Sequence, residues 1–387
     1  MKLPLTEPTT AHDRHVPAAL FWKARFFDAS ARAWRRLGQL ESAALRAEID
    51  NVEITRPIYV AGVARSGTTI ITEMLARHPD VTSHRYSDFP NVYTPYWRNW
   101  LAARSPSSPA PAVERAHRDR LMVTRESPEA VEEVIWMQFF EHLHDPARDQ
   151  VMTGEHARPA FEAFYRDHIR KLLLARAATR YLSKGNYNAT RLGYLLGLFP
   201  DARFVVPVRH PLSHVASLVK QDRLFCRLAA EDPRVPRQLR MSGHFEFGPG
   251  KACIHAGRAD VAARIQALWA NGRDVHGWAL YWNAVYGHLI RAVESNPALR
   301  EAVSFVRYED LCRNADSTIS GLLQHCRLAA EAFEPVRLEY LERLSEPDYY
   351  RPDFSEDEIS QLLESTDTTA AWFGYSPDRA PDRKVPL

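Results

Sequence analysis

The sequence predicts an α/β fold, in which helices cover both faces of a parallel sheet and a helical extension precedes the sheet. Three observations support this prediction: short apolar runs alternate with stretches of helical periodicity, the first run leads into a loop bounded by glycines, and residues 17–49 carry apolar side chains at helical spacing. We expect residues 1–50 to form the extension and residues 51–387 to form a single α/β domain, because no shift in composition marks another boundary.

The composition excludes several classes of protein. The chain has 387 residues, of which 45% are hydrophobic and 25% are charged, and these values are typical of a globular protein rather than a disordered or fibrous one. The 50 basic residues nearly balance the 48 acidic ones, so the net charge is only +2, which argues against a protein that coats nucleic acid. Only seven of the basic residues are lysines, so a lysine in a special position stands out.

The sequence shows no targeting segment. Its N-terminus lacks the apolar core of a signal peptide, and no run of about 18 apolar residues is present that could span a bilayer. We therefore expect a cytoplasmic protein without a transmembrane segment. The four cysteines form no C-x-x-C pair, which favours free thiols, and the cysteines and histidines form no recognisable ligand set, so we expect no metal.

The helical extension comes first along the chain. Aromatic residues recur at helical spacing within residues 17–49, among them Phe21, Phe26, Phe27 and Trp34. We expect these helices to pack on the main domain as an arm. A homodimer contact and a helix at a membrane surface are the two alternatives.

Four short apolar runs predict the strands of the sheet. They cover residues 58–63, 180–183, 203–208 and 303–307, and bounded runs of this kind are typical of buried parallel strands. The helical stretches among them cover residues 68–77, 161–178, 189–198 and 277–294. Pro207 predicts an edge strand or a bulge in the third run, because proline donates no hydrogen bond to a ladder. Residues 105–111 and 244–257 are rich in Pro, Ser or Gly and predict loops.

A phosphate-binding loop is predicted directly after the first strand. The segment from Gly62 to Thr69 has the frame G-x-x-x-x-G, followed by two hydroxyl residues that open a helix. The backbone N–H groups of such a loop and the helix N-terminus point at a bound anion. The residues expected to contact that anion are Arg65, Ser66, Gly67, Thr68 and Thr69.

The loop departs from that of nucleotide triphosphatases in two ways. Thr68 stands where the triphosphatase loop has its lysine, and the third strand ends in Arg209 rather than in an aspartate that holds Mg²⁺. An arginine there can pair with a phosphate directly, and Ser217 on the following helix can add a hydroxyl. The sequence therefore predicts two phosphate sites, at least one of which is filled without metal.

Other candidate residues also follow strands. Lys184 follows the second predicted strand, and Tyr308 and Glu309 follow the fourth. Open α/β sheets bind their ligands beyond the carboxyl ends of the strands. We therefore expect these residues to meet Arg209 and the phosphate loop at one edge of the sheet.

These motifs resemble those of the sulfotransferase superfamily, whose members transfer sulfuryl groups from 3′-phosphoadenosine 5′-phosphosulfate (PAPS). Residues 63–69 are similar to the family's P-R-S-G-T-T loop, and residues 208–217 resemble its R-D-P-x-x-x-x-x-S signature. Residues 182–204 resemble its K-…-L-F-P-D-A-K-F segment, and residues 306–311 resemble its V-R-Y-E-D-L segment. The sequence departs from the family at Ala64, where a Pro is usual, and at His210, where an Asp is usual, without loss of a phosphate contact.

The resemblance implies a P-loop-like sulfotransferase fold and in-line transfer to a hydroxyl acceptor without a metal. It implies that the loop binds the 5′-phosphosulfate of PAPS, and that Arg65 and Lys184 stabilise charge on the leaving group. It also implies that Arg209 and Ser217 hold the 3′-phosphate, which stays on the product PAP.

The general base is predicted only as a set of candidates. Members of the family use a His or a Glu shortly after the phosphate-loop helix, where this sequence has His84 and Asp88. Asp88 is the first candidate, because burial beside aromatic neighbours would raise its pKa toward that of a useful base. His84 is the second candidate, and Glu132 or Glu133 is the third.

The acceptor is predicted as a small-molecule or glycan hydroxyl. Aromatic residues gather within residues 89–100 and 278–286, and such side chains stack on sugars or line hydrophobic pockets, so we prefer a carbohydrate or glycolipid. Two other functions match part of the pattern. A P-loop kinase of a small metabolite would need the missing lysine and aspartate, and a catalytically inactive nucleotide-binding protein would bind PAP but transfer no sulfate.

Overall fold

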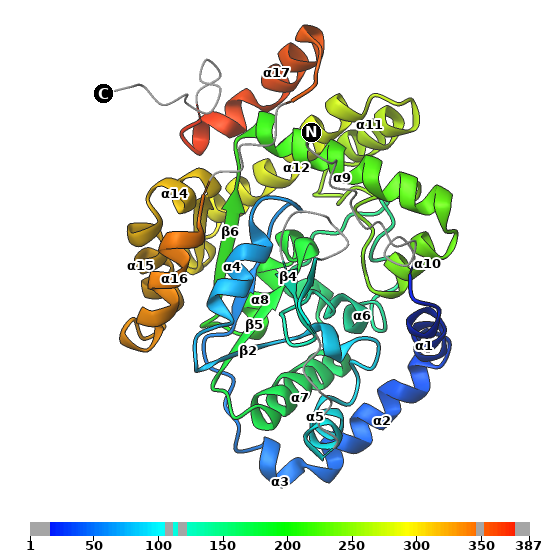
Figure 1. The fold of residues 1–387 in the computed structure, drawn as a ribbon, viewed down its shortest axis with the longest axis vertical. Coiled ribbons are helices and arrows are strands. Elements are labelled where there is room, and N and C mark those ends of the chain that lie inside the picture. The colour runs from blue at the N-terminus through cyan, green and yellow to red at the C-terminus, as the bar shows by residue number, and fades with distance from the viewer. Residues whose placement is uncertain (1–15, 105–110, 115–121, 346–351, 376–387) are drawn as a thin grey trace, which may run out of the picture.

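The computed structural model describes residues 16–104, 111–114, 122–345 and 352–375. Its main sheet has five parallel strands in the order β2-β5-β1-β6-β7 (Figure 1). They are β1 (Ile58–Val60), β2 (Val81–Ser83), β5 (Arg180–Lys184), β6 (Arg203–Val208) and β7 (Val303–Arg307). A separate antiparallel pair consists of β3 (Val113–Glu114) and β4 (Met122–Val123). The parallel sheet confirms the predicted α/β class.

Helices surround this sheet. The N-terminal arm consists of α1 (Ala18–Ala29), α2 (Ala31–Ala44) and α3 (Arg46–Ile49). The helices from β1 to β7 are α4 (Thr68–Leu75), α5 (Pro95–Arg104), α6 (Glu133–Trp136), α7 (Pro159–Ala175), α8 (Leu192–Leu198), α9 (Pro211–Glu231), α10 (Arg234–Met241), α11 (Ala259–Ala270), α12 (Asp274–Ser295) and α13 (Pro297–Ala302). After β7 come α14 (Tyr308–Arg313), α15 (Ala315–Cys326), α16 (Glu334–Arg343) and α17 (Glu356–Trp372). Short 3₁₀ turns are η2 (Tyr86–Asp88), η3 (Gly154–His156), η4 (Asn186–Thr190) and η5 (Glu331–Phe333).

The predicted strands all exist, with small changes in their bounds. The first is shorter than expected, because the chain leaves the ladder after Val60 and turns into the phosphate loop. The edge strand β2 and the pair β3–β4 are not among the predicted strands. Each is only two or three residues long, which is too short for a period of two to show in the sequence.

The two faces of the sheet bury different side chains, because neighbouring residues of a strand point to opposite sides. On one side, Ile58 and Val60 of β1 belong to a cluster with apolar residues of α4, α14, α15 and α16. On the other side, Tyr59 belongs to a cluster with residues of α7, α8, α9 and α12. Helices therefore cover both faces, as predicted (Figure 1).

Pro207 lies in the interior of the sheet, which corrects the expectation of an edge strand or a bulge. β6 is paired on both sides, with β1 and with β7. Two residues before Pro207, the carbonyl of Val205 accepts a hydrogen bond from Ala61 on the side of β1. Because β1 has ended at Val60, the proline nitrogen on that side leaves no ladder bond unmade. The Pro207 carbonyl accepts a hydrogen bond from Tyr286 OH at 2.8 Å instead.

The N-terminal helices pack on the main domain through a buried ion pair. Lys171 of α7 and Glu41 of α2 lie 3.0 Å apart, and neither side chain is exposed. Lys171 Nζ also donates to the carbonyl of Gly38 at 2.9 Å, and Glu41 Oε1 accepts from the backbone N–H of Trp97 at 2.6 Å. Because an unpaired buried charge is costly, these bonds tie α2 firmly to α7 and α5.

The remaining sequence expectations concern loops, thiols and membrane spans. Residues 244–257 contain no helix or strand, as predicted, and lie between α10 and α11. The predicted loop 105–111 lies almost wholly outside the described residues. Cys226, Cys253, Cys312 and Cys326 are free thiols. In the part of the chain that the structure describes, no helix is long and apolar enough to cross a membrane.

Candidate functional site

The loop between β1 and α4 has the backbone of an anion site. Arg65 has a left-handed backbone with a φ of 71°, and Gly67, with a φ of 109°, directly precedes α4. Glycine is favoured at Gly67 because a Cβ atom there would be strained and would lie 2.7 Å from the ring of Tyr308. A backbone of this kind turns successive N–H groups toward one point, beside the N-terminus of α4.

A buried histidine that the sequence analysis missed fixes this loop. His214 of α9 donates from Nε2 to the carbonyl of Ala64 at 2.8 Å, and its Nδ1 accepts from Trp282 Nε1 at 3.1 Å. These bonds require the neutral tautomer with its proton on Nε2. Burial lowers the pKa of His214 to about 3, so the ring stays neutral near pH 7. His214 follows Arg209 closely in the sequence, but only the fold shows that it contacts the loop.

The structure brings the predicted cations and hydroxyls together at the carboxyl edge of the sheet. Lys184, the last residue of β5, donates from Nζ to Thr69 Oγ1 at 3.1 Å. Arg65 donates from Nε to Ser217 Oγ at 3.3 Å, which joins the phosphate loop to α9. Arg209 is buried between the end of β6 and the start of α9. The two predicted phosphate sites are therefore neighbours.

The residues after β7 position the Arg209 segment. Glu309 accepts from the backbone N–H of His210 at 2.9 Å and from Tyr375 OH at 2.7 Å. The guanidinium of Arg209 lies 5.2 Å from the centre of the Tyr308 ring, a cation–π distance. Tyr308 and Glu309 thus meet Arg209, as expected. Tyr375, which follows α17, is a further partner that no motif indicated.

Asp88 lies in a different electrostatic setting from the one that the sequence predicted. It accepts from Arg176 Nη2 at 2.7 and 3.0 Å, forms an ion pair with Arg98, and lies 3.3 Å from His84 Nδ1. Burial alone would raise the pKa of Asp88, but the hydrogen bond from His84 and the charges of both arginines outweigh it and hold that pKa well below its usual range. The expected raised pKa is wrong, because the sequence did not show that two arginines face this carboxylate.

A second buried histidine completes this cluster. His168 Nε2 of α7 lies 3.1 Å from His84 Nε2, so only one proton fits between the two rings. His84 donates from Nδ1 to Asp88, and its Nε2 accepts from His168. The Nδ1 atom of His168 is buried without a hydrogen-bond partner among the described residues. Burial lowers the pKa of His168 well below its usual value, so this ring stays neutral near pH 7.

We expect this cluster to make the fold sensitive to acid. Below about pH 6.5 the unfolded chain binds a proton at His168 that the folded chain does not bind, so the free energy of unfolding falls as the pH falls. One such proton changes that free energy by up to about 1.4 kcal/mol per pH unit. Urea unfolding at about pH 7.5 and about pH 5.5 measures the loss.

His168→Gln should lose less stability than the wild type between these two pH values, because glutamine cannot bind the proton that the unfolded wild type takes up at His168. The matched control is His156→Gln, at an exposed position of η3, which should show the wild-type loss. An identical loss in both variants would contradict the role of His168.

Glu132 and Glu133 hold the interior together. Glu132 accepts from Trp136 Nε1 at 2.9 Å and from a tyrosine hydroxyl of β5. Glu133 accepts from Arg191 at 2.7 and 2.8 Å and lies 2.8 Å from His144 Nε2. Burial would raise the pKa of Glu133, but Arg191 and His144 lower it to about 2. Their oxygens are occupied by these partners, which favours a structural role.

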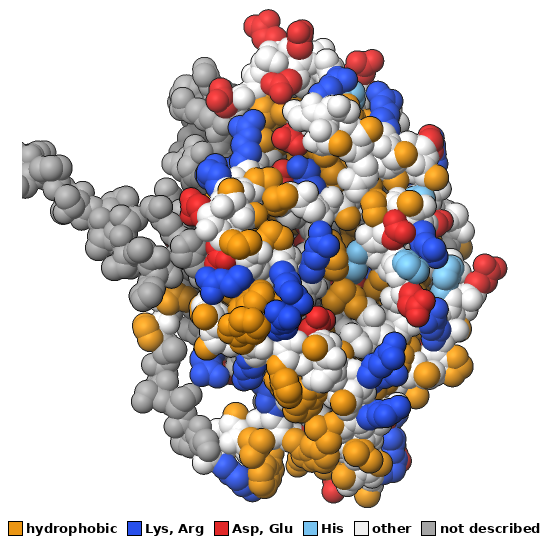
Figure 2. Space-filling view, turned by 90° about the vertical axis from the view of Figure 1, so that its right-hand side faces the viewer, with side chains coloured by type: hydrophobic (Ala, Val, Ile, Leu, Met, Phe, Trp, Pro, Cys, Tyr) orange, Lys and Arg blue, Asp and Glu red, His pale blue; other side chains and the backbone are white. Residues whose placement is uncertain are grey.

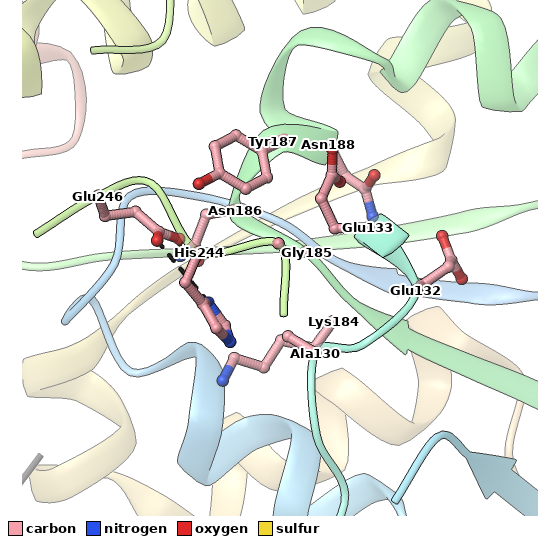
Figure 3. A pocket seen from close by; sticks show the side chains of 11 residues that line it. Ala130, Glu132, Glu133, Lys184, Gly185, Asn186, Tyr187, Asn188, His244 and Glu246 are labelled. Atoms are coloured by element: carbon pink, nitrogen blue, oxygen red, sulfur yellow. Dashed lines mark hydrogen bonds and ion pairs between the residues drawn. The ribbon is translucent and has the colours of Figure 1, made fainter. Parts of the chain in front are cut away.

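A third histidine lies beside Lys184, in a pocket that the sequence analysis did not identify. His244, Lys184, Asn186 and Glu246 line this pocket at the end of β5 (Figure 3). His244 Nδ1 lies 3.7 Å from Glu246 Oε2, and the other oxygen of Glu246 accepts from Asn186 Nδ2 at 2.6 Å. Asn186 therefore orients the carboxylate, and the carboxylate faces the imidazole.

The charges around His244 favour an imidazole that binds protons well. Burial lowers the pKa of His244, but the carboxylate of Glu246 and the charge of Glu129 outweigh it, so the pKa lies above its ordinary value. Burial raises the pKa of Glu129, but the charges of Lys184 and His244 outweigh it and lower that pKa. Glu129, Lys184 and His244 thus form one coupled set of charges.

The backbone before His244 is fixed by packing. Gly243 has a φ of 80°, and a Cβ atom at that position would lie 2.6 Å from Glu133 Cβ. Glu133 therefore supports the turn that presents His244. The only local signal in the sequence is a His two residues before a Glu in a glycine-rich stretch, which is too common to mark a site.

A second, largely apolar pocket shares His244. Its walls come from α9, α10 and the loop of residues 244–257 that follows α10. They include Phe225, Pro236, Leu239, Phe245 and Phe247. One imidazole thus borders both a polar pocket with Lys184 and a pocket with a hydrophobic lining.

Comparison with known proteins shows that the fold, and part of the sequence, resemble those of sulfotransferases. The structure of sulfotransferase STF9 from Mycobacterium avium matches with a TM-score of 0.53 and 15% identity, over 87% of this chain and 82% of that one. Sulfotransferase STF1 from Mycobacterium tuberculosis H37Rv matches with a TM-score of 0.50 and 15% identity, over 90% and 85%. Residues 57–233 match the profile of the Sulfotransferase family. The chain therefore has the sulfotransferase fold. No curated protein has a significantly similar sequence.

The segment that matches the family profile contains only some of the candidate site. The phosphate loop, Lys184, Arg209 and Ser217 all lie within residues 57–233. His244 and Glu246 lie beyond it, in the insertion that follows α10. The candidate anion-binding residues therefore lie in the segment that resembles the family, whereas His244 and Glu246 come to Lys184 only through the fold.

Proposed function

We propose that this chain transfers a sulfuryl group from PAPS to a hydroxyl acceptor. The observation that carries the proposal is the convergence of Arg65, Lys184, Arg209 and Ser217 with the phosphate loop at one edge of the sheet. PAPS has two separate anionic groups, and the loop and the Arg209–Ser217 pair offer two neighbouring anion sites. The positive φ of Gly67 also suits a loop whose N–H groups converge on an anion.

PAPS would supply the activated sulfuryl group. The N–H groups of the loop and Lys184 would stabilise the negative charge that develops on the leaving 5′-phosphate oxygen. Thr69 keeps the Lys184 ammonium at the N-terminus of α4, where this charge would form. Arg209 and Ser217 would bind the 3′-phosphate, with Tyr308 and Glu309 fixing the arginine segment.

His244 is the general base in this proposal. It borders the same pocket as Lys184, and Glu246 lies next to its Nδ1, which leaves Nε2 to take the proton from the acceptor hydroxyl. Asp88 and His84, the first two sequence candidates, are committed to Arg176, Arg98 and each other. Glu132 and Glu133 line the same pocket, but their oxygens are already bonded to Trp136 and Arg191.

The acceptor proposed here combines a hydroxyl with an apolar portion. Phenylalanine, leucine and proline side chains beside His244 would contact that portion at the surface, because the space between them, about 10 Å³, is too small to enclose it. Among the predicted acceptors, this favours a glycolipid over a free carbohydrate.

Two measurements on the 387-residue chain test the function. Calorimetry should show PAP binding that is independent of Mg²⁺, and weaker binding of ATP at any Mg²⁺ concentration. Incubation with [³⁵S]PAPS and a panel of hydroxyl acceptors should then yield a labelled product. Mg²⁺-dependent ATP binding without PAP binding would favour a P-loop kinase, and PAP binding without transfer to any acceptor would favour an inactive binding protein.

A further inference from the structure

Helix α1 is apolar on both sides. Its inner side, with Phe21 and Ala24, packs against Met241 of α10. Its outer side carries Trp22 and Phe26, one helical turn apart, and these side chains are 59% and 60% exposed. Burying two large aromatic rings would be strongly favourable, so their exposure needs an explanation.

The apolar exposure continues onto neighbouring helices. Leu40 of α2 is exposed, as are Trp100 and Leu101 of α5, and α2 is bonded to α5 through Glu41. On the face of the molecule that carries α1 and α2, hydrophobic side chains lie among lysines and arginines (Figure 2). We call the outer surfaces of α1 and α2, with Trp22, Phe26 and Leu40, the arm face.

The charge around the arm face is mostly positive. The exposed basic residues of α1 and α2 are Lys23, Arg25, Arg32 and Arg36, and the single exposed acid of these two helices is Asp28. This local excess contrasts with the nearly neutral chain as a whole. The guanidinium of Arg25 lies 5.2 Å from the Trp22 ring, so cationic and aromatic groups are interleaved.

We propose that the arm face docks on an anionic membrane surface. A helix that lies in the bilayer interface buries aromatic side chains among the acyl chains, while flanking Lys and Arg meet anionic headgroups. Long basic side chains suit this position because their stems cover apolar surface and their charges reach the headgroups. A second copy of the chain is a poorer partner, because a symmetric contact would bring the same basic residues together. The proposal does not use the sulfotransferase assignment, because none of these residues lies in the candidate site.

Co-sedimentation of the full-length protein with lipid vesicles tests this proposal. We expect binding to vesicles of phosphatidylcholine mixed with phosphatidylglycerol, weaker binding to phosphatidylcholine alone, and release at high salt. Trp22→Ser/Phe26→Ser should weaken binding by about tenfold or more. Lys23→Glu/Arg32→Glu should do the same through charge.

Matched controls separate the arm face from the rest of the surface. Leu338→Ser, at an exposed apolar position of α16, and Arg223→Glu/Arg264→Glu, which makes the same change in net charge, should bind as the wild type does. Circular dichroism should show unchanged folding, because all of these side chains are exposed. As a second measurement, brominated lipids should quench the fluorescence of the wild type more than that of Trp22→Phe.

Three results would overturn the proposal. The first is a wild type that binds neither kind of vesicle or binds both equally. The second is unchanged vesicle binding in Trp22→Ser/Phe26→Ser. The third is a dimer in sedimentation velocity that this double substitution dissociates, which would make the arm face a contact between protein chains.

Discussion

Replacing His244 with Gln should lower kcat/KM for sulfuryl transfer by about 10²- to 10⁴-fold, the range expected for loss of a general base. Glutamine keeps hydrogen-bonding groups at this position but cannot take the proton from the acceptor hydroxyl. His244 does not belong to either proposed phosphate site, so the affinity for PAP should stay close to that of the wild type. Initial rates with [³⁵S]PAPS and calorimetry with PAP measure the two quantities separately.

The pH dependence of kcat/KM provides a second test of His244 as the base. The base works only when neutral, and its pKa lies above its ordinary value of about 6.5, so wild-type kcat/KM should rise with pH through an apparent pKa above that value. Glu246→Gln removes a negative charge that raises this pKa, so it should shift the rising limb to lower pH. A limb that does not move would argue against a positioning role for Glu246.

Asp88→Asn tests the competing assignment, in which Asp88 is the general base. It removes a carboxylate that Arg176 and Arg98 neutralise, so we expect a loss of stability but a nearly normal rate per folded molecule. Suppose that Asp88→Asn abolished both sulfuryl transfer and the rise of kcat/KM with pH, and that His244→Gln retained both. The base would then be Asp88, as first predicted from the sequence.

Replacing Arg209 with Ala should weaken PAP binding by about 10- to 150-fold, since a hydrogen bond to a charged group contributes about 1.5–3 kcal/mol. Arg209 is buried at the end of β6, where the ring of Tyr308 holds its guanidinium. A charge that is already desolvated and oriented gains more from a bound phosphate than a flexible surface charge does. Calorimetry with PAP measures the change.

The ligand AMP supplies the control for this substitution, because it lacks the 3′-phosphate. Arg209→Ala should leave AMP affinity almost unchanged, and so should Arg258→Ala, which removes an exposed arginine paired with Asp260, for both ligands. An equal loss for PAP and AMP would place Arg209 at the 5′ side or show general damage. An unchanged affinity for PAP would refute the assignment of the 3′-phosphate site.

Much of the fold could be predicted because its signals are local. The strand cores, the loop from Gly62 to Thr69 and the arginine at the end of β6 each depend on a few consecutive residues. The rule that ligands lie beyond the carboxyl ends of parallel strands then placed Lys184 and Arg209 near one another, and the structure has them at one edge. The short strands β2, β3 and β4 carry too few residues for such a signal.

The settings of individual charged groups could not be predicted, because they depend on residues far away in the sequence. Asp88 is opposed by Arg176, 88 positions later, and Glu133 by Arg191, 58 positions later. Each pKa is therefore decided by partners that only the packing of helices supplies. The prediction from Pro207 was wrong for the same reason. A proline fits in the interior strand β6 only because the neighbouring strand β1 ends at Val60.

The sequence by itself determined that this chain is an α/β protein with a lysine-free, glycine-bounded loop after the first strand and an arginine at a strand end, because both features are set by consecutive residues. Only the tertiary structure decided which titratable side chains share an environment. It joined Asp88 to two arginines, placed His244 beside Lys184, and left Trp22 and Phe26 exposed on the arm. Contacts between distant segments set desolvation and charge, and these two quantities separate a buried structural carboxylate from a working base.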